Sequence, residues 1–434
     1  MSISPGKPSL TAGSTESVSF RGYNPAGRVE LAYEVGGEHI KQARGQGRFL
    51  VKPVVDLRAC RVRAVVDWVD WVKLRVCTRE RCDHTAIQAI ITPHLGSRPS
   101  VFAQNRDDKR KSTEFVITLQ EPQAAKLAKI DTALRWSPLI VHGPTPVAME
   151  VAVDFYPKDN TVETRQRMVA VLQQHVLATH DAWSHKLGKP RCTVTRFAPK
   201  TKVVLTRAGK RVEKPDWSET FKFEDEEEIG HRAFVEGTYY VGPKNGPVSW
   251  RIQDKTTDER KGRRARALPE AEHRARIEVK LTGKAFQELQ IANVSDLMAF
   301  RFVTLRKRYF RFGTPTLPPL RTDAAPLPTL VNRRIREGYW RVFSETGVLG
   351  LLRLDQKHAR IRSTVNKAKP ASQRNRKANG RLERHQVGRR PWQTMRDEVP
   401  SDWDVGHHGY LAAFTELNDR VRHALEDLNL APTS

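Results

Sequence analysis

Two carboxylates lie on one face of a strand that the segment Met149–Tyr156 predicts. In its sequence, MEVAVDFY, alternation places Glu150 and Asp154 on the face opposite Val151 and Val153. Carboxylates that face one another across adjacent strands repel, and this is tolerated mainly where a cation joins them. The pattern therefore indicates a metal site on the polar face of a sheet.

A second polar surface is predicted by residues 237–281, which are typical of a β-hairpin followed by a third strand. Strand-like runs at Thr238–Val241 and Val248–Asp254 flank a turn rich in Gly and Pro, and RARIEVKL follows a basic connector. Alternation turns the polar side chains of the second and third strands to one face: Arg251, Gln253, Lys255, Arg276, Glu278 and Lys280. Because polar outer faces are common in antiparallel sheets, this face is either merely solvated or a working surface.

In type and order, these segments resemble the rolling-circle replication initiation proteins of plasmids and filamentous phages. The likeness is carried by a strand ending in an acidic residue (AVDF), a Tyr-Val-Gly hairpin that runs into RIQDK, and a strand RIEVKL followed by a helix, within residues 65–300. Initiators of this type also tend to open with an Asp-Trp strand, as VDWVDWVKLRV does here. The resemblance implies a DNA nicking and joining endonuclease with a tyrosine nucleophile and a divalent metal.

The same resemblance implies roles for individual residues. Asp154 and Glu278 match the family's acidic metal-site positions, and Lys255 matches the lysine after the hairpin strand, at the catalytic site. Together with Glu150, the two acids form the expected ligand set for Mg²⁺ or Mn²⁺. A metal there would act as a Lewis acid at the scissile phosphate.

The expected nucleophile position departs from the family pattern. Family members often have Arg-Ile-Tyr-Asp-Lys where this chain has Gln253, and an amide cannot form a phosphotyrosine link. Tyr239 and Tyr240, one strand earlier, are therefore the candidate nucleophiles. Two alternatives remain open: a nucleic-acid-binding protein on the same scaffold that does not cut, and a nuclease in which the acidic residues activate water.

Composition favours a nucleic-acid partner. In 434 residues the chain has 75 Lys and Arg against 49 Asp and Glu, a formal charge of +26 with a pI near 10.2, which suits binding to a polyanion such as DNA. A run of about 18 apolar residues is absent, and the start, MSISPGKPSL, lacks the layout of a signal peptide. These features predict a cytoplasmic protein with no membrane partner.

Basic residues in three places are expected to contact DNA. Two lie on the polar face, two in the connector after Lys255 and three in a basic stretch further on: Arg251, Arg276, Arg263, Arg264, Arg374, Arg376 and Lys377. Such residues neutralise backbone phosphates, although solvated linkers have the same composition.

The cysteines are too few for a disulfide framework, in agreement with a reducing compartment. There are four, and Cys60, Cys77 and Cys82 together with His84 offer a possible zinc site. Their spacing matches no standard zinc finger, so the sequence leaves zinc binding open.

The pattern of strands and helices predicts an α+β fold with a central, mostly antiparallel sheet, helices packed on one face, and a small, helical, basic C-terminal region. The expected segments are a flexible arm (1–50), the initiator-like domain (51–313), a Pro-rich linker (314–328), a helical segment (329–355), a basic disordered segment (356–400) and a C-terminal helix (401–434). A helix-turn-helix is one alternative for 329–355. The last helix is expected to dock on the body or on a second subunit, which leaves a homodimer open.

Overall fold

A computed structural model provides the three-dimensional structure of the chain. It describes residues 10–21, 28–40, 48–64, 69–108, 110–178, 192–196, 200–205, 211–216, 219–223, 235, 238–243, 245–260, 264–317, 333–352, 354 and 411–430. The expected basic segment 356–400 lies outside the described residues.

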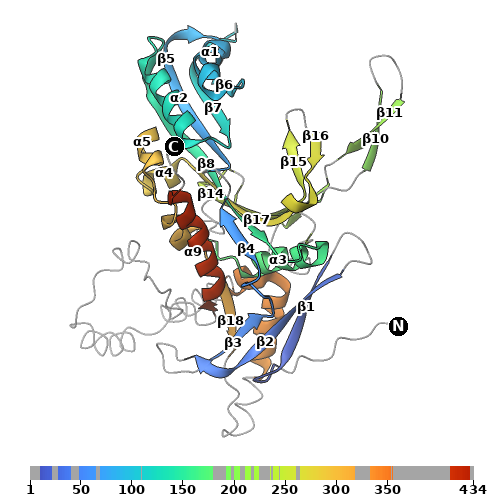
Figure 1. Cartoon of the computed structure of the whole chain (residues 1–434). Helices are drawn as coiled ribbons and strands as arrows, with labels where there is room; N and C mark the ends of the chain where they lie inside the picture. Colours follow the sequence, from blue (N-terminus) through green and yellow to red (C-terminus); the bar gives the residue numbers. More distant parts are fainter. Residues whose placement is uncertain are drawn as a thin grey trace, which may run out of the picture.

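A large antiparallel sheet forms the centre of the fold (Figure 1). Its strands are β4 (Arg61–Ala64), β5 (Trp71–Cys82), β6 (Ser100–Gln104), β7 (Ser112–Gln120), β8 (Ile140–Tyr156), β9 (Cys192–Arg196), β12 (Glu219–Phe223), β13 (Thr238–Val241), β14 (Val248–Lys255) and β17 (Arg274–Thr282). They are ordered β12-β9-β13-β14-β17-β8-β5-β7-β6, and β4 also pairs with β8. Together with the helices, this sheet confirms the predicted α+β class.

The predicted hairpin and third strand are both present in this sheet. β13 pairs with β14, and β14 pairs with β17 with Trp250 opposite Val279. The apolar side chains of these strands, among them Trp250, Ile252 and Ile277, are fully buried. Alternation therefore turns the polar residues of β14 and β17 to the opposite face, as the sequence predicts.

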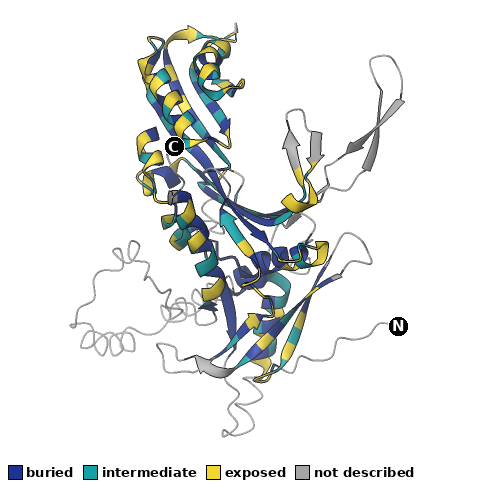
Figure 2. Ribbon diagram, in the orientation of Figure 1, coloured by how far each residue is buried: buried dark blue, intermediate teal, exposed yellow. Residues whose placement is uncertain are grey.

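Helices cover the apolar face of the large sheet. They are α1 (His84–Leu95), α2 (Ala124–Trp136), α3 (Val162–His175), α4 (Lys284–Glu288), α5 (Val294–Met298), α6 (Thr304–Arg308) and α9 (Thr415–Leu430). Local sequence defines their ends: Asp83 accepts a hydrogen bond from the Thr85 N–H at the start of α1, and Gly96 ends it at a left-handed φ of +75°. The central strands and α3 are mostly buried, whereas α1 and α2 alternate buried and exposed residues (Figure 2).

A second sheet corrects the expectation of a flexible arm at residues 1–50. It contains β1 (Thr15–Arg21), β2 (Arg28–Ile40), β3 (Arg48–Pro53), β18 (Gly313–Leu317) and β19 (Leu411–Ala413). Buried alternating residues such as Val18, Phe20 and Leu31 form its core. The Gly and Ser content of this stretch hides the alternation, and its partners β18 and β19 are far away in sequence. β18 also takes up the first residues of the expected linker 314–328.

A buried histidine joins the second sheet to α3. His175 Nε2 lies 3.1 Å from the Tyr33 hydroxyl, and its Nδ1 lies 2.7 Å from the carbonyl oxygen of Gly313. Burial lowers the pKa of His175 to about 4, so the ring is neutral at physiological pH. α3 thus contacts β14 and β17 on one side and β2 on the other.

The C-terminal part of the chain adds two helical segments. Residues 333–352 are helical, as expected for 329–355. α9 docks on the body of the protein, against β4, β8 and α6, and buries Leu417, Val421 and Leu425. It begins later than the sequence predicts because Leu411–Ala413 pairs with β18. No helix among the described residues is long and apolar enough to span a membrane.

Candidate metal and nucleic-acid site

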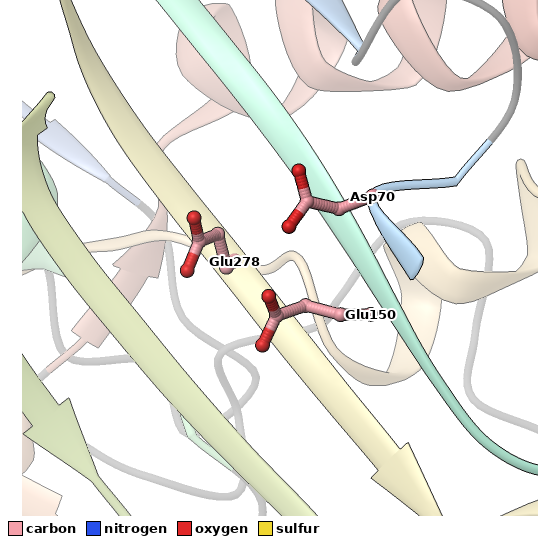
Figure 3. A group of neighbouring side chains, drawn as sticks. All are labelled: Asp70, Glu150 and Glu278. Atoms are coloured by element: carbon pink, nitrogen blue, oxygen red, sulfur yellow. The ribbon is translucent and has the colours of Figure 1, made fainter. Parts of the chain in front are cut away.

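Three carboxylates meet on the polar face of the large sheet (Figure 3). Asp70 immediately precedes β5, Glu150 lies on β8 and Glu278 lies on β17. One oxygen of each lies within 4.8 Å of the others, and Glu150 and Glu278 are buried. We refer to Asp70, Glu150 and Glu278 as the acidic triad. Among the described residues, this is the only group of three or more acidic, His or Cys side chains close enough to hold a metal ion.

Strand register brings the triad together. β17 pairs with β8 so that Lys280 faces Glu150 and Glu278 faces Ala152, which makes the two glutamates diagonal neighbours. The N–H of Asp70 donates to the carbonyl oxygen of Glu150 at 2.9 Å, which holds the start of β5 beside β8. Three segments far apart in sequence therefore contribute one carboxylate each.

Each carboxylate of the triad accepts hydrogen bonds from a neighbouring side chain. The indole Nε1 of Trp71 donates to Glu150 at 2.9 Å, and the amide of Gln253 donates to Glu278 at 3.0 Å. Arg251 donates from Nε to Glu278 and from Nη2 to Glu150, the latter at 3.3 Å. The neutral donors Trp71 and Gln253 orient the carboxylate oxygens, as outer partners do around metal ligands, whereas the charged Arg251 contacts oxygens that a cation would use.

The electrostatics of the two glutamates differ. Burial, followed by the charge of Glu278, raises the pKa of Glu150 to about 8. Burial also acts to raise the pKa of Glu278, but Arg251 and Arg276 outweigh it and hold that pKa below its usual value. These shifts favour a protonated Glu150 beside an ionised Glu278, and a cation bound at the triad would compete with the Glu150 proton.

Asp154, an expected metal ligand, lies outside this group. The guanidinium of Arg276 donates to both of its oxygens, at 2.5 and 2.8 Å, and Arg274 lies 3.0 Å away. Arg276 also donates to Asp70 at 3.2 Å and is only 3% exposed. Its expected role as a DNA contact is therefore corrected: it is a buried partner of carboxylates.

The two candidate tyrosines lie on opposite faces of β13. Tyr240 is directly opposite Arg251, on the face of the triad, and is partly exposed. Tyr239 is opposite Ile252 on the apolar face and is buried. Only Tyr240 of this pair shares a face with the triad.

Lys255 lies at the end of β14, on the same face as Arg251. Its side chain is partly exposed, and its charge contributes to the lowered pKa of Glu278. Lys255, an expected residue of the catalytic site, therefore lies within electrostatic range of the triad.

The other basic residues expected to bind DNA are largely outside the described part of the chain. Arg263, Arg374, Arg376 and Lys377 are not among the described residues. Arg264 begins β16 (Arg264–Ala267), which pairs with β15 (Thr257–Arg260) in a hairpin that projects from the main sheet (Figure 1).

The possible zinc ligands do not form a metal group. Cys60 is buried, Cys77 is exposed and Cys82 is partly buried, and all three are free thiols. His84 pairs instead with Asp83, at 2.9 Å. Burial raises the pKa of the Cys60 thiol to about 12, which disfavours the thiolate that binds metal.

Asp70 is the triad member that alternation along the strands does not reveal. It lies just before β5 rather than within a strand, so no strand face can be assigned to it from the sequence. The sequence signal that could have identified Asp70 is the Asp-Trp pair at the start of this strand. The neighbouring Trp71 donates a hydrogen bond to Glu150, so the pair marks the strand end that lies beside the triad.

No family model and no curated protein matches this chain. The chemistry available to the protein comes from the side chains that the fold brings together on the polar face. These are the acidic triad, its arginine partners and Tyr240.

Proposed function

We propose that the protein nicks and rejoins DNA as rolling-circle replication initiators do, with Tyr240 as nucleophile and a divalent metal at the acidic triad. The observation that carries this proposal is the convergence of Asp70, Glu150 and Glu278 on the sheet face that also presents Tyr240. The excess of 75 Lys and Arg over 49 Asp and Glu supports a polyanionic substrate.

The triad fits Mg²⁺ or Mn²⁺. These are hard cations that take oxygen ligands, and the triad offers three carboxylates with oxygens within 4.8 Å of one another. Burial and the charge of Glu278 raise the pKa of Glu150, and a bound cation would offset both effects by favouring the carboxylate. A divalent ion bound there would polarise the scissile phosphate as a Lewis acid.

Register places Tyr240, Arg251 and Glu278 in one row across β13, β14 and β17. In the proposed reaction, the Tyr240 phenol oxygen attacks the phosphorus and forms a new P–O bond. The bond from phosphorus to the 3′ oxygen breaks, and the phenol proton ends on that oxygen through solvent. Reversal of these steps rejoins the strand, because the phosphotyrosine conserves the ester.

Arg251 is suited to meet the phosphate in this reaction. Its side chain is 32% exposed while its guanidinium contacts two carboxylates of the triad. A guanidinium recognises phosphate as it recognises carboxylate, through paired N–H donors. A cation held by the triad would neutralise the carboxylates that Arg251 contacts, and its guanidinium could then donate to a phosphate oxygen.

One observation favours a second candidate function, a metal-dependent nuclease that uses water. Gln253 takes the position where the resemblance expects the nucleophilic tyrosine, and its amide holds Glu278. Tyr240 lies one strand further from the triad. With water as nucleophile, no covalent protein–DNA adduct would form.

The test is incubation of the purified protein with single-stranded and supercoiled DNA from the genetic element that encodes it, with Mn²⁺ or Mg²⁺, followed by denaturing gels. We expect a protein band shifted by covalently attached DNA, lost in Tyr240→Phe and kept in Tyr239→Phe. The second variant is a matched control, since its hydroxyl lies on the opposite face. Cleavage without an adduct would identify the water nuclease, and binding without cleavage would rule out both enzymes.

A further inference from the structure

The polar face of the large sheet continues beyond the triad onto β5, β7 and β6. Helices α1 and α2 cover the apolar face of this part of the sheet, where Val72, Leu74 and Phe115 are buried. The opposite, open face carries aromatic and basic side chains: Trp71, Lys73, Arg75 and Phe102. We refer to these four residues as the open-face strip.

Register shows that the strip is continuous with the triad. Trp71 is directly opposite Glu150 and bonds to it. Lys73 and Arg75 lie two and four residues after Trp71 on β5, so their side chains point to the same face as Trp71. Arg75 is opposite Val116 of β7, and Val116 is opposite Phe102 of β6, so Phe102 shares this face. At about 4.8 Å per strand, β6 lies roughly 19 Å from β17.

The side chains of the strip combine ring faces with cations. Lys73 Nζ lies 5.3 Å from the centroid of the Trp71 ring. Arg75 is half exposed and forms a long ion pair, 3.8 Å, with Glu114. Phe102 is 53% exposed on the open face of an edge strand. Unpaired bases stack on aromatic rings, and the phosphates between them pair with cationic side chains. An alternation of rings and cations therefore suits a single strand of nucleic acid.

We propose that the open-face strip binds a single strand of DNA next to the acidic triad, with bases stacked on Trp71 and Phe102 and phosphates near Lys73 and Arg75. This inference rests on the proposed function, because it assigns a path to the substrate of that site. A single strand fits the strip better than a duplex does, since base pairing and stacking hide the base faces from a protein ring. Charge complementarity and continuity with Glu150 favour DNA over a protein partner at this face.

The experiment measures fluorescence anisotropy of a labelled oligonucleotide of about 12 nucleotides, a length within the range of single-strand sites. We expect Phe102→Ala to weaken binding about 5- to 10-fold, at the lower end of base stacking on aromatic rings. Lys73→Gln should reduce the slope of log affinity against log salt by about 0.7, the value for one contact to single-stranded phosphate.

Two variants on the helical face of the same lobe serve as matched controls. Trp136→Ala removes an aromatic ring that is 83% exposed at the end of α2, and Lys129→Gln removes an exposed charge on α2. Neither should change binding. Thermal melting of all four variants checks that they are folded.

Each outcome supports or overturns the proposal. Weaker binding in Phe102→Ala and a smaller salt slope in Lys73→Gln, with both controls unchanged, support it. If the wild-type protein binds the oligonucleotide but these two variants bind equally well, the strip is not the path, and the metal-dependent cleavage remains to be judged by its own assay. A duplex that competes as well as the single strand overturns the choice of substrate. Absence of both binding and cleavage in the wild type overturns the proposed function as well.

Discussion

Two groups of charged residues on one face of the large sheet, the acidic triad and Asp154 with its arginines, contain buried carboxylates in different surroundings. β8 and β17 contribute Glu150 and Glu278 to the acidic triad, and they also contribute Asp154 and its partner Arg276. Asp154 has two guanidiniums within 3.0 Å, from Arg274 and Arg276. The triad has three carboxylates that share Arg251 and one nitrogen of Arg276.

The difference lies in the balance of charge. At Asp154 the arginines match or exceed the acid, so a cation would find no surplus negative charge to bind. At the triad three acids share two arginines, and burial, followed by the charge of Glu278, raises the pKa of Glu150. The count of arginine partners thus separates a structural ion pair from a candidate metal site, although both contain buried acids.

The largest effect is expected for Asp154→Ala. This substitution leaves Arg276 buried without its main partner, and removing one member of a buried pair costs about 3–5 kcal/mol of unfolding free energy. Urea unfolding measures it. Glu163→Ala, which breaks the exposed pair with Arg167, is the control and should cost less than about 1 kcal/mol. A small loss in Asp154→Ala would show that the Asp154 cluster is not structural.

The next effect concerns metal binding. Glu278→Gln removes a carboxylate from the centre of the triad, so Mn²⁺ affinity measured by calorimetry should fall at least about 100-fold. Glu114→Gln, which removes a carboxylate that lies on the same face and pairs with Arg75, should leave it unchanged. Equal Mn²⁺ affinity in wild type and Glu278→Gln would show that the acidic triad is not a metal site and is structural, like the ion pairs around Asp154.

A smaller effect is expected for Arg251→Gln. Its guanidinium competes with a metal for Glu150 and Glu278, so its loss should tighten Mn²⁺ binding, by about tenfold for 1.4 kcal/mol of relieved competition. Weaker Mn²⁺ binding would instead mean that Arg251 positions the ligands. Arg75→Gln, on the same face but without a contact to the triad in the described structure, provides the comparison.

The smallest effect is a pH dependence of stability from Glu150. Its usual pKa is 4.5 and its folded pKa is about 8, so between these values folding takes up a proton and stability falls as pH rises. Glu150→Gln cannot ionise and should lack this slope. Between pH 7 and 8 the difference should be on the order of 1 kcal/mol, measured by urea unfolding at each pH.

The pH window avoids a second group that titrates in the opposite sense. His175 has a usual pKa of 6.5 and a folded pKa of about 4, so it lowers stability as pH falls below 6.5. Above pH 7 its contribution is constant. Parallel stability curves for wild type and Glu150→Gln over pH 7–8 would mean that Glu150 is ionised in the fold like an ordinary carboxylate.

The sequence alone determined much of the main sheet and one face of the site. Strict alternation in β8, β14 and β17 sorts apolar from polar side chains, because successive residues of a strand point to opposite faces. It therefore placed Glu150 on the polar face of its strand and Arg251 and Glu278 on the polar face of theirs, and the pairing of β14 with β17 and of β17 with β8 joins these faces. The same rule, applied to β13, left both tyrosines as candidates until pairing with β14 placed Tyr240 on that surface.

Only the tertiary structure decided which acids form a group. Asp154 and Glu150 are equivalent by alternation, but register places Arg276 opposite Asp154 and Lys280 opposite Glu150. Asp70 joins the triad through a backbone hydrogen bond to β8, about 80 residues later in the chain, and the strands of residues 15–53 find partners still further away. The alternation of residues along a strand shows which face of the sheet a side chain takes. The balance of charge around a buried acid depends on residues that the pairing of distant strands brings next to it.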